Sequence, residues 1–162
     1  MTDVNSGAQK VRVSVADWRV AEGEAALVTS GLGSCVAVGV YDPERAVGGL
    51  LHAMLPEAPS PVETPAKYVD AGLDELLSAL YRRGASPDRV AAKVVGGSAM
   101  LDISVGGAIG QRNVEAARRV LEDAGVPLVA AETGGHSGRS VSFSPASGDL
   151  QISRVDSEVE TI

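Results

Sequence analysis

Apolar and polar residues alternate over several short stretches of the chain, and this pattern predicts β-strands. The predicted strands are residues 11–15, 25–28, 34–41, 48–55, 90–95, 126–131, 140–143 and 149–152. Residues 34–41 and 48–55 are almost continuously apolar, as buried strands are, and the turn-forming pair Asp42-Pro43 lies between them. We therefore expect these two strands to pair as neighbours, and the last two strands to form a hairpin.

Two other stretches carry apolar residues at the spacing of a helix face. They are residues 67–83, followed by Gly84, and residues 113–124, followed by Gly125. Prolines recur from residue 56 to residue 65, which predicts an irregular loop long enough to overhang a site.

The length and composition predict one soluble globular domain. With 162 residues, 44% of them apolar and 22% charged, the chain leaves little room for a second core. We expect a single domain over residues 1–162, with its core at 11–154 and flexible ends at 1–10 and 156–162. Aromatic residues make up only 3% of the chain, so the core must be mainly aliphatic.

The charge and the N-terminal residues exclude several classes of protein. A net charge of −7 argues against nucleic acid as a ligand, because binding a phosphate backbone needs a concentrated basic surface. The first ten residues lack the positive segment and apolar run of a signal peptide, and no later stretch is long enough to span a bilayer. We therefore expect a cytoplasmic protein without membrane insertion.

Cys35 is the only cysteine, so it forms no disulfide within the chain and is a free thiol. It follows a glycine-containing bend, Thr29-Ser-Gly-Leu-Gly-Ser34, which is suited to presenting the thiol beside free backbone N–H groups near Gly33 and Ser34. Residue types alone leave two interpretations open. Cys35 is either a nucleophile beside an oxyanion hole or a small buried hydrophobe, and the second is the commoner fate of a lone cysteine.

A nucleophilic thiol needs a nearby imidazole or a helix N-terminus to favour its thiolate. His52 follows Cys35 by 17 residues, in the strand expected to return alongside the first, and Thr29 is a candidate for fixing the imidazole tautomer. Taken alone, His52 is more often a satisfied buried histidine than a base. The expected strand pairing allows contact with Cys35, but spacing does not decide between these interpretations.

Other glycines and polar residues carry weaker signals. The glycines at 96–97 and 106–110 are scattered across a loop and do not open a helix after the first strand, so we reject a dinucleotide fingerprint. They are expected to form turns or the walls of a substrate groove. Gln111, Arg112 and Asn113 are candidate substrate contacts, and the alternatives are that Asn113 caps the helix and that Arg112 is solvated.

A metal site is not expected. His136 receives no catalytic role, and the spacing of Cys35, His52 and His136 lacks the clustering that a closed zinc site requires.

Several motifs, in order along nearly the whole chain, resemble those of the CheD family of chemoreceptor glutamine deamidases. They are Thr29-Ser-Gly-Leu-Gly-Ser-Cys-Val-Ala-Val38, Tyr41-Asp-Pro43, Gly48-Gly-Leu-Leu-His-Ala-Met-Leu-Pro56, Lys67-Tyr-Val-Asp70, Ala92-Lys-Val-Val-Gly-Gly-Ser-Ala-Met100, Ile109-Gly-Gln-Arg-Asn-Val114 and Thr133-Gly-Gly-His-Ser-Gly-Arg139. The resemblance implies an α/β (α+β) fold of mixed, largely antiparallel β-sheets with helices packed outside. It also implies a fold similar to the catalytic domain of cytotoxic necrotizing factor toxins.

The resemblance implies a catalytic site and an activity. In that family the cysteine of the first motif is the nucleophile, the histidine of the third is the general base, and an upstream threonine orients the histidine. These residues correspond to Cys35, His52 and Thr29. The expected reaction converts selected glutamines on the helical cytoplasmic domain of chemoreceptors to glutamate through a cysteine thioester, and the family also hydrolyses glutamyl methyl esters there. This chemistry requires neither a metal nor a cofactor.

Two rival functions stay open. The family is often governed by CheC, a phosphatase of the response regulator CheY, so the first rival is a protein that acts chiefly by binding and activating such a phosphatase. The second rival is a cysteine hydrolase of another protein amide or ester.

Overall fold

The computed structural model describes residues 9–99, 108–155 and 157–162. Within these ranges the chain forms ten strands, two α-helices and one short 3-10 helix, Pro65–Lys67. The strands are β1 (Lys10–Arg12), β2 (Asp17–Glu22), β3 (Ala26–Leu32), β4 (Val36–Asp42), β5 (Val47–Ala53), β6 (Ala91–Gly96), β7 (Leu128–Thr133), β8 (Arg139–Phe143), β9 (Leu150–Ser153) and β10 (Glu160–Thr161). The helices are α1 (Val69–Arg82) and α2 (Ile109–Asp123).

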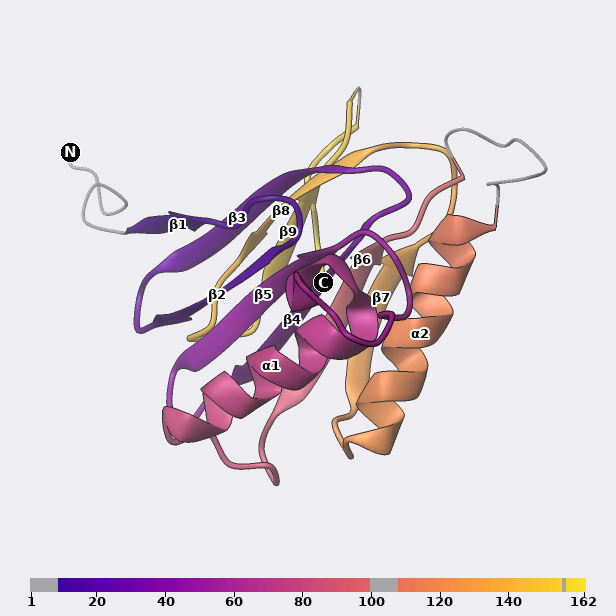
Figure 1. The fold of residues 1–162 in the computed structure, drawn as a ribbon. Helices are drawn as coiled ribbons and strands as arrows, with labels where there is room; N and C mark the ends of the chain where they lie inside the picture. Colours follow the sequence, from indigo (N-terminus) through magenta and orange to yellow (C-terminus); the bar gives the residue numbers. More distant parts are fainter. Residues whose placement is uncertain (1–8, 100–107, 156) are drawn as a thin grey trace.

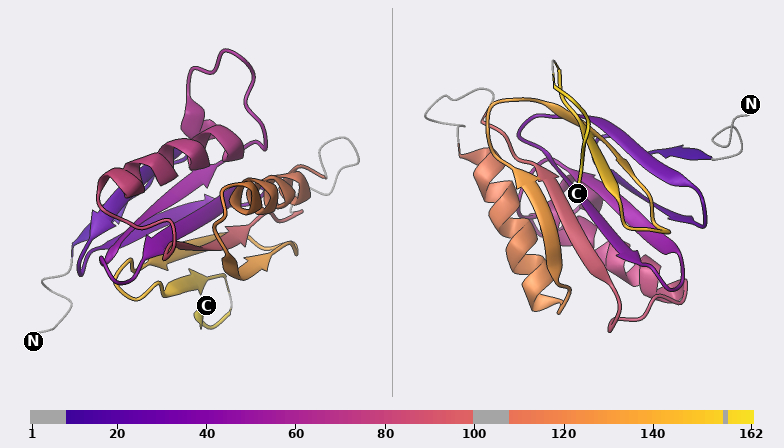
Figure 2. Two further views of the ribbon diagram at one scale, coloured as in Figure 1. Left: turned by 90° about the horizontal axis from the view of Figure 1, so that it is seen from below. Right: turned by 180° about the vertical axis from the view of Figure 1, so that it is seen from behind.

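The strands form two five-stranded sheets, and both helices cover one face of the second sheet (Figures 1 and 2). The first sheet has the strand order β1-β3-β8-β9-β10 and the second has the order β2-β5-β4-β6-β7. Among the strands of the described ranges, β1–β3 and β6–β7 pair in parallel, and the other pairs are antiparallel. The predicted mixture of largely antiparallel sheets with helices packed outside is therefore confirmed.

Apolar residues fill both sides of the second sheet, because it lies between the helices and the first sheet. In β4, Val36 and Val38 belong to the core under the helices, whereas Ala37 belongs to the core between the two sheets. Burial on both faces explains why β4 and β5 are continuously apolar in the sequence. The space between the sheets is where β3 faces β4 and β5.

The strongest predictions from the pattern of residues are confirmed. β4 and β5 are antiparallel neighbours, with a register that runs from Val36↔Ala53 to Asp42↔Val47. The predicted helix over residues 67–83 corresponds to α1, and the predicted C-terminal hairpin is formed by β8 and β9. The proline-containing stretch before the 3-10 helix carries no helix or strand, as expected.

The structure differs from the predictions at four places in the sheets. Strand β2 was not predicted, because its residues have mixed exposure at a sheet edge and do not alternate regularly. The expected strand over residues 11–15 is shorter, ending at Arg12, while the one expected at 25–28 extends to Leu32. The acidic C-terminal end does not fray throughout, since β10 pairs with β9 and Lys93 Nζ donates to the carbonyl of Ile162 at 2.8 Å.

The expected flexible residues 1–8, and Asp156, lie outside the described residues. Neither of the described helices is long and apolar enough to cross a membrane.

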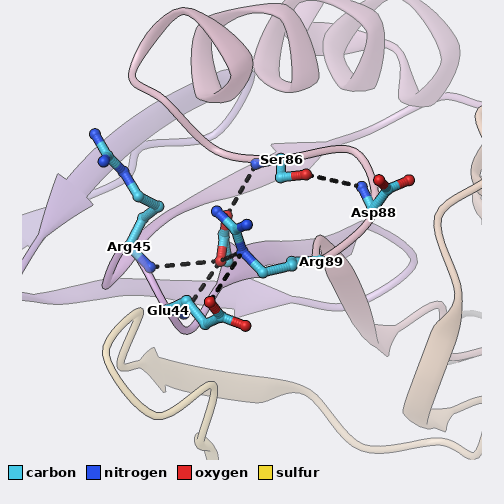
Figure 3. A network of polar contacts seen from close by, with 6 residues as sticks. Glu44, Arg45, Ser86, Asp88 and Arg89 are labelled. Atoms are coloured by element: carbon cyan, nitrogen blue, oxygen red, sulfur yellow. Dashed lines mark hydrogen bonds and ion pairs between the residues drawn. The ribbon is translucent and has the colours of Figure 1, made fainter.

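A buried carboxylate joins the end of β4 to the loop after α1 (Figure 3). Asp42 is fully buried and accepts hydrogen bonds from the backbone N–H groups of Glu44, Arg45 and Ser86. The guanidinium of Arg89 donates to both carboxylate oxygens, at 3.0 and 2.9 Å. Burial alone would raise the pKa of Asp42, but these hydrogen bonds and the charge of Arg89 hold it below its usual range.

Candidate active site

The candidate nucleophile lies at the other end of β4, directly before its first residue. Cys35 is half-buried and packs against the core between the two sheets. The preceding turn depends on Gly31, whose positive φ of 76° suits glycine, and on a hydrogen bond from Gly33 N–H to the Gly31 carbonyl at 3.1 Å. The bend predicted from the glycines therefore places Cys35 at the edge of the core.

The strand register places His52 beside this thiol. His52 in β5 is fully buried and lies opposite Ala37 of β4. Cys35 and Ala37 are two residues apart, so they share one side of the sheet, and Cys35 is the diagonal neighbour of His52. Diagonal neighbours have Cα atoms about 7–8 Å apart, within reach of a long side chain. The register thus places the predicted nucleophile and the predicted base on the same side of the sheet, in neighbouring strands.

Thr29 reaches His52 from the facing sheet. The Thr29 hydroxyl is buried, lying 2.8 Å from His52 Nδ1 and 2.6 Å from the Val13 carbonyl oxygen. A carbonyl only accepts, so the single hydroxyl proton goes to Val13 and the hydroxyl accepts a hydrogen bond from Nδ1–H. In the neutral ring this leaves the lone pair on Nε2.

His52 Nε2 is buried and has no hydrogen-bond partner among the described residues. A buried nitrogen without a partner costs stability, so such atoms are rare outside functional sites. Together with the Thr29 contact, this makes Nε2 the atom available to take a proton from a neighbouring thiol.

Burial keeps both groups neutral. It lowers the pKa of His52, and it raises the pKa of the Cys35 thiol against a smaller opposing effect of the Cys35 backbone N–H. The resting pair is therefore a thiol and a neutral imidazole. Such a pair reacts when the imidazole removes the thiol proton as the sulfur attacks.

The backbone around the thiol offers N–H donors. Gly33 N–H is used within the turn, so of the predicted oxyanion residues Gly33 and Ser34 only Ser34 keeps its own N–H available. Within residues 9–99, 108–155 and 157–162, the N–H groups of Ser34 and Cys35 donate to no backbone carbonyl. Two backbone donors next to a nucleophile can stabilise a tetrahedral oxyanion.

Helix α2 begins earlier than predicted, at Ile109 instead of Asn113. Gly110 reads as a helix breaker in the sequence, but here it lets the first turn of α2 pack against Gly97 and Ser98, whose carbonyls a Cβ would meet at 2.6 and 2.5 Å. The interpretation of Asn113 as a cap is wrong, because it is buried inside the helix and bonds to the carbonyls of Ser34 and Met54.

The remaining candidates, Arg112 and His136, form no hydrogen bond with Cys35, His52 or Thr29 among the described residues. Arg112 is exposed on α2, and among the described residues its side chain forms no hydrogen bond or ion pair. His136 is exposed before β8, with Nδ1 3.2 Å from the Ala99 carbonyl. In the described parts of the chain, no three His, Cys, Asp or Glu side chains are grouped so as to hold a metal ion.

Sequence reasoning considered Asn113 as a substrate contact or a helix cap, and missed that its side chain bonds to the backbone next to Cys35. The only signal in the sequence was a polar residue at an inward position of an amphipathic helix, three residues after Gly110 and three before Ala116, both of them buried.

Two solved structures show limited likeness to this fold. Bacillus licheniformis hypothetical protein YfiH has a TM-score of 0.47 and 17% identity, covering 72% of this chain and 49% of that chain. A Neisseria meningitidis protein of the DUF152 family has a TM-score of 0.48 and 12% identity, covering 82% of this chain and 64% of that chain. The expected similarity to cytotoxic necrotizing factor toxins stays a prediction.

The sequence of the chain has much nearer relatives. A "Probable chemoreceptor glutamine deamidase CheD" of Natronomonas pharaonis is 43% identical over 157 residues, covering 95% of this chain and 93% of the relative. The "Chemoreceptor glutamine deamidase CheD" of Thermotoga maritima is 39% identical over 143 residues, covering 88% and 90%. The family model described as CheD chemotactic sensory transduction matches residues 54–154. The chain belongs to the CheD family.

Proposed function

We propose that this protein deamidates glutamine side chains of chemotaxis receptors, with Cys35 as nucleophile, His52 as general base and Thr29 as the residue that orients His52. The observation that carries the proposal is the hydrogen bond between Thr29 Oγ1 and His52 Nδ1, which leaves Nε2 buried and without a partner among the described residues. The names of the relatives support the substrate class.

The family match and the site geometry are separate supports. The family model matches residues 54–154, so its match begins after Thr29, Cys35 and His52. The catalytic arrangement therefore depends on contacts in the structure and not on that match.

The first half of the reaction forms a thioester. His52 Nε2 takes the Sγ proton while the sulfur attacks the side-chain carbonyl carbon of the glutamine. The negative charge that develops on the carbonyl oxygen is stabilised by the N–H groups of Ser34 and Cys35. The proton on Nε2 then passes to the amide nitrogen, the carbon–nitrogen bond breaks, and ammonia leaves.

The second half restores the thiol. His52 Nε2 removes a proton from water as the water oxygen attacks the thioester carbonyl, and the carbon–sulfur bond then breaks. The proton returns to Sγ, and the side chain leaves as glutamate. Thr29 holds Nδ1 protonated throughout, so that Nε2 alone exchanges protons. A glutamyl methyl ester would give the same thioester with methanol as the leaving group.

The substrate class sets the partner and the place of action. The expected substrate segment is the helical cytoplasmic domain of a chemoreceptor, so we place the protein in the cytoplasm. Binding to a CheC phosphatase is a further prediction. If binding is separable from catalysis, the phosphatase should still be activated by a protein that lacks the Cys35 thiol. The reaction as written needs no metal or cofactor.

The direct test is mass spectrometry of a chemoreceptor cytoplasmic fragment incubated with the native protein or with Cys35→Ala. The native protein should convert selected glutamines to glutamate, and Cys35→Ala should convert none. Conversion by Cys35→Ala at the native rate would refute the nucleophile assignment.

Two further arms separate the rival functions. Unrelated helical peptides should not be deamidated, and unselective turnover would favour a hydrolase of other protein amides. A CheC phosphatase assay with Cys35→Ala separates a binding role from catalysis, because only the loss of deamidation is expected of this variant.

A further inference from the structure

Asn113 is a polar residue in an otherwise apolar position. It is fully buried in α2, on the face that also carries Gly110, Ala116 and Ala117. Burying an amide in such surroundings costs free energy unless its hydrogen bonds are made. Its partners therefore indicate why the position is polar.

The Asn113 side chain bridges the two strands where their ladder stops. The β4–β5 register ends at Val36↔Ala53, and continuing it by one residue would pair Cys35 with Met54. The chain after β5 instead turns away, since Met54 N–H donates to the Lys67 carbonyl. Asn113 Nδ2 spans the gap, donating to Ser34 O at 2.9 Å and to Met54 O at 3.0 Å.

Each carbonyl in the segment before β4 is held from the side of β6 and α2. Ser98 N–H donates to Gly33 O at 2.9 Å, Asn113 Nδ2 donates to Ser34 O at 2.9 Å, and Gly97 N–H donates to Cys35 O at 2.8 Å. Of these three donors only Asn113 uses a side chain, so it is the one that a substitution removes without altering the backbone.

Holding a carbonyl also orients the N–H of the next residue. A trans peptide unit is planar, with its C=O and N–H pointing in opposite directions. The Ser34 carbonyl and the Cys35 N–H belong to the same peptide unit. The hydrogen bond from Asn113 to Ser34 O therefore turns the Cys35 N–H away from α2.

Helix α2 is close enough to act this way because of two glycines. A Cβ on Gly97 would lie 2.7 Å from the Gly110 carbonyl oxygen, and a Cβ on Gly110 would lie 2.6 Å from the Gly97 carbonyl oxygen. Any larger residue at either position would push the start of the helix, and with it Asn113, away from the loop.

We propose that Asn113 is a positioning residue for deamidation: by binding Ser34 O, it sets the peptide plane that directs the Cys35 N–H to the oxyanion. This inference rests on the proposed function. Asn113 acts through Ser34 and Cys35 and does not itself exchange protons with the substrate.

The test compares two reactions of the same thiol in Asn113→Ala and in Asn113→Leu, which is of similar size and has no donor. Deamidation of a receptor fragment passes through a tetrahedral oxyanion, whereas alkylation of Cys35 by iodoacetamide does not. In both variants kcat for deamidation should fall by about 10- to 100-fold, somewhat less than the loss of a whole oxyanion donor. KM and the alkylation rate should stay within about twofold of native.

Leu121→Ala provides the matched control. Leu121 is also buried on α2, two turns beyond Asn113, and lies in the core under the helices. It tests whether loosening the helix alone lowers activity, and it should leave kcat within about twofold of native at a temperature where every variant is folded.

Several results would overturn the inference. They are a native kcat in both Asn113 variants, an equal fall in alkylation and deamidation, or an equal loss of kcat in Leu121→Ala. A native protein with no deamidase activity would instead refute the proposed function, and this inference with it. Should Asn113→Ala fail to fold, Asn113→Leu decides the outcome, because it fills a similar volume and removes the amide donor without burying a charge.

Discussion

The two ends of the β4–β5 pair differ in whether their buried polar atoms have hydrogen-bond partners. At the Asp42 end, a buried carboxylate accepts three backbone N–H groups and the guanidinium of Arg89. At the Cys35 end, three buried side-chain atoms have no partner in the described parts of the chain: His52 Nε2, Ser98 Oγ and Asn113 Oδ1. Satisfied buried groups stabilise a fold, whereas unsatisfied ones cost stability and are kept where chemistry needs them.

The ionisation of the two ends follows the same division. Despite its burial, Asp42 has a pKa below its usual range because its hydrogen bonds and Arg89 favour the charged form. Among the described residues neither His52 nor Cys35 has an ion-pair partner, so burial has the largest effect: it favours the neutral form of each, and their pKa values move in opposite directions. One end therefore holds a fixed charge, and the other holds two neutral groups ready to exchange a proton.

The largest effect is expected from His52→Gln at the Cys35 end. Without the base, kcat for deamidation should fall by about 10⁴-fold or more. The free energy of unfolding should change by only about 1 kcal/mol, because the lost hydrogen bond to Thr29 is offset by removing an unpaired nitrogen. Receptor deamidation assays and urea unfolding measure the two quantities. A kcat within tenfold of native would contradict the assignment of His52 as the base.

Asp42→Ala should do the reverse. It leaves several donors without an acceptor, so the free energy of unfolding should fall by about 2–4 kcal/mol, while kcat well below the unfolding temperature stays within about twofold of native. Arg83→Ala is the control, since it breaks an exposed pair with Glu22 and should cost under about 1 kcal/mol. If both variants unfold at the same urea concentration, the Asp42 network is not a source of stability.

Thr29→Val tests how the base is oriented. The substitution keeps the shape but removes the hydroxyl that accepts from His52 Nδ1–H, so the imidazole loses its preferred tautomer. We expect kcat to fall by about 10- to 100-fold, at the lower end of what acid–base groups contribute. Thr29→Ser keeps the hydroxyl and should recover most of the activity. Equal losses in both variants would show that packing, and not the hydroxyl, matters.

The smallest effect is a difference in how stability depends on pH. Burial lowers the pKa of His52, so just below pH about 6.5 the unfolded chain binds more protons than the folded one. The free energy of unfolding therefore decreases as the pH is lowered from about 6.5 to the pKa of His52 in the folded protein. The pKa of Asp42 is also lowered, so its contribution is lost only below pH about 3.9.

Urea unfolding of the native protein and of His52→Gln across these two ranges separates the contributions. The difference in slope between the proteins should appear only in the range just below pH about 6.5, since the substitution removes the imidazole of His52 alone. If the free energies of unfolding of the two proteins change in parallel over both pH ranges, burial does not lower the pKa of His52.

The sequence predicted those parts of the fold whose hydrophobic period is regular. β4, β5 and α1 are buried along their whole length or along one face, so their patterns are strong. The pairing of β4 with β5 also follows from the short turn between them. The predicted pairing of these two strands was enough to suggest that the side chains of Cys35 and His52 lie close together.

The rest depends on contacts between elements that are distant in sequence. The Thr29–His52 hydrogen bond crosses from one sheet to the other, and no local pattern specifies how two sheets face one another. The role of Asn113 depends on the position of α2, which two glycines allow but which no periodicity predicts. β2 and β10 have weak patterns of their own, and their pairing with β5 and β9 places them.

The most direct test of the Cys35 end is to intercept the thioester. Hydroxylamine attacks thioesters, so it should compete with water and convert part of the receptor glutamine to a glutamyl hydroxamate. With the native protein we expect hydroxamate at the same glutamines that otherwise become glutamate, and none with Cys35→Ala. Glutamate without hydroxamate at any hydroxylamine concentration, or hydroxamate formed by Cys35→Ala, would contradict covalent catalysis by Cys35.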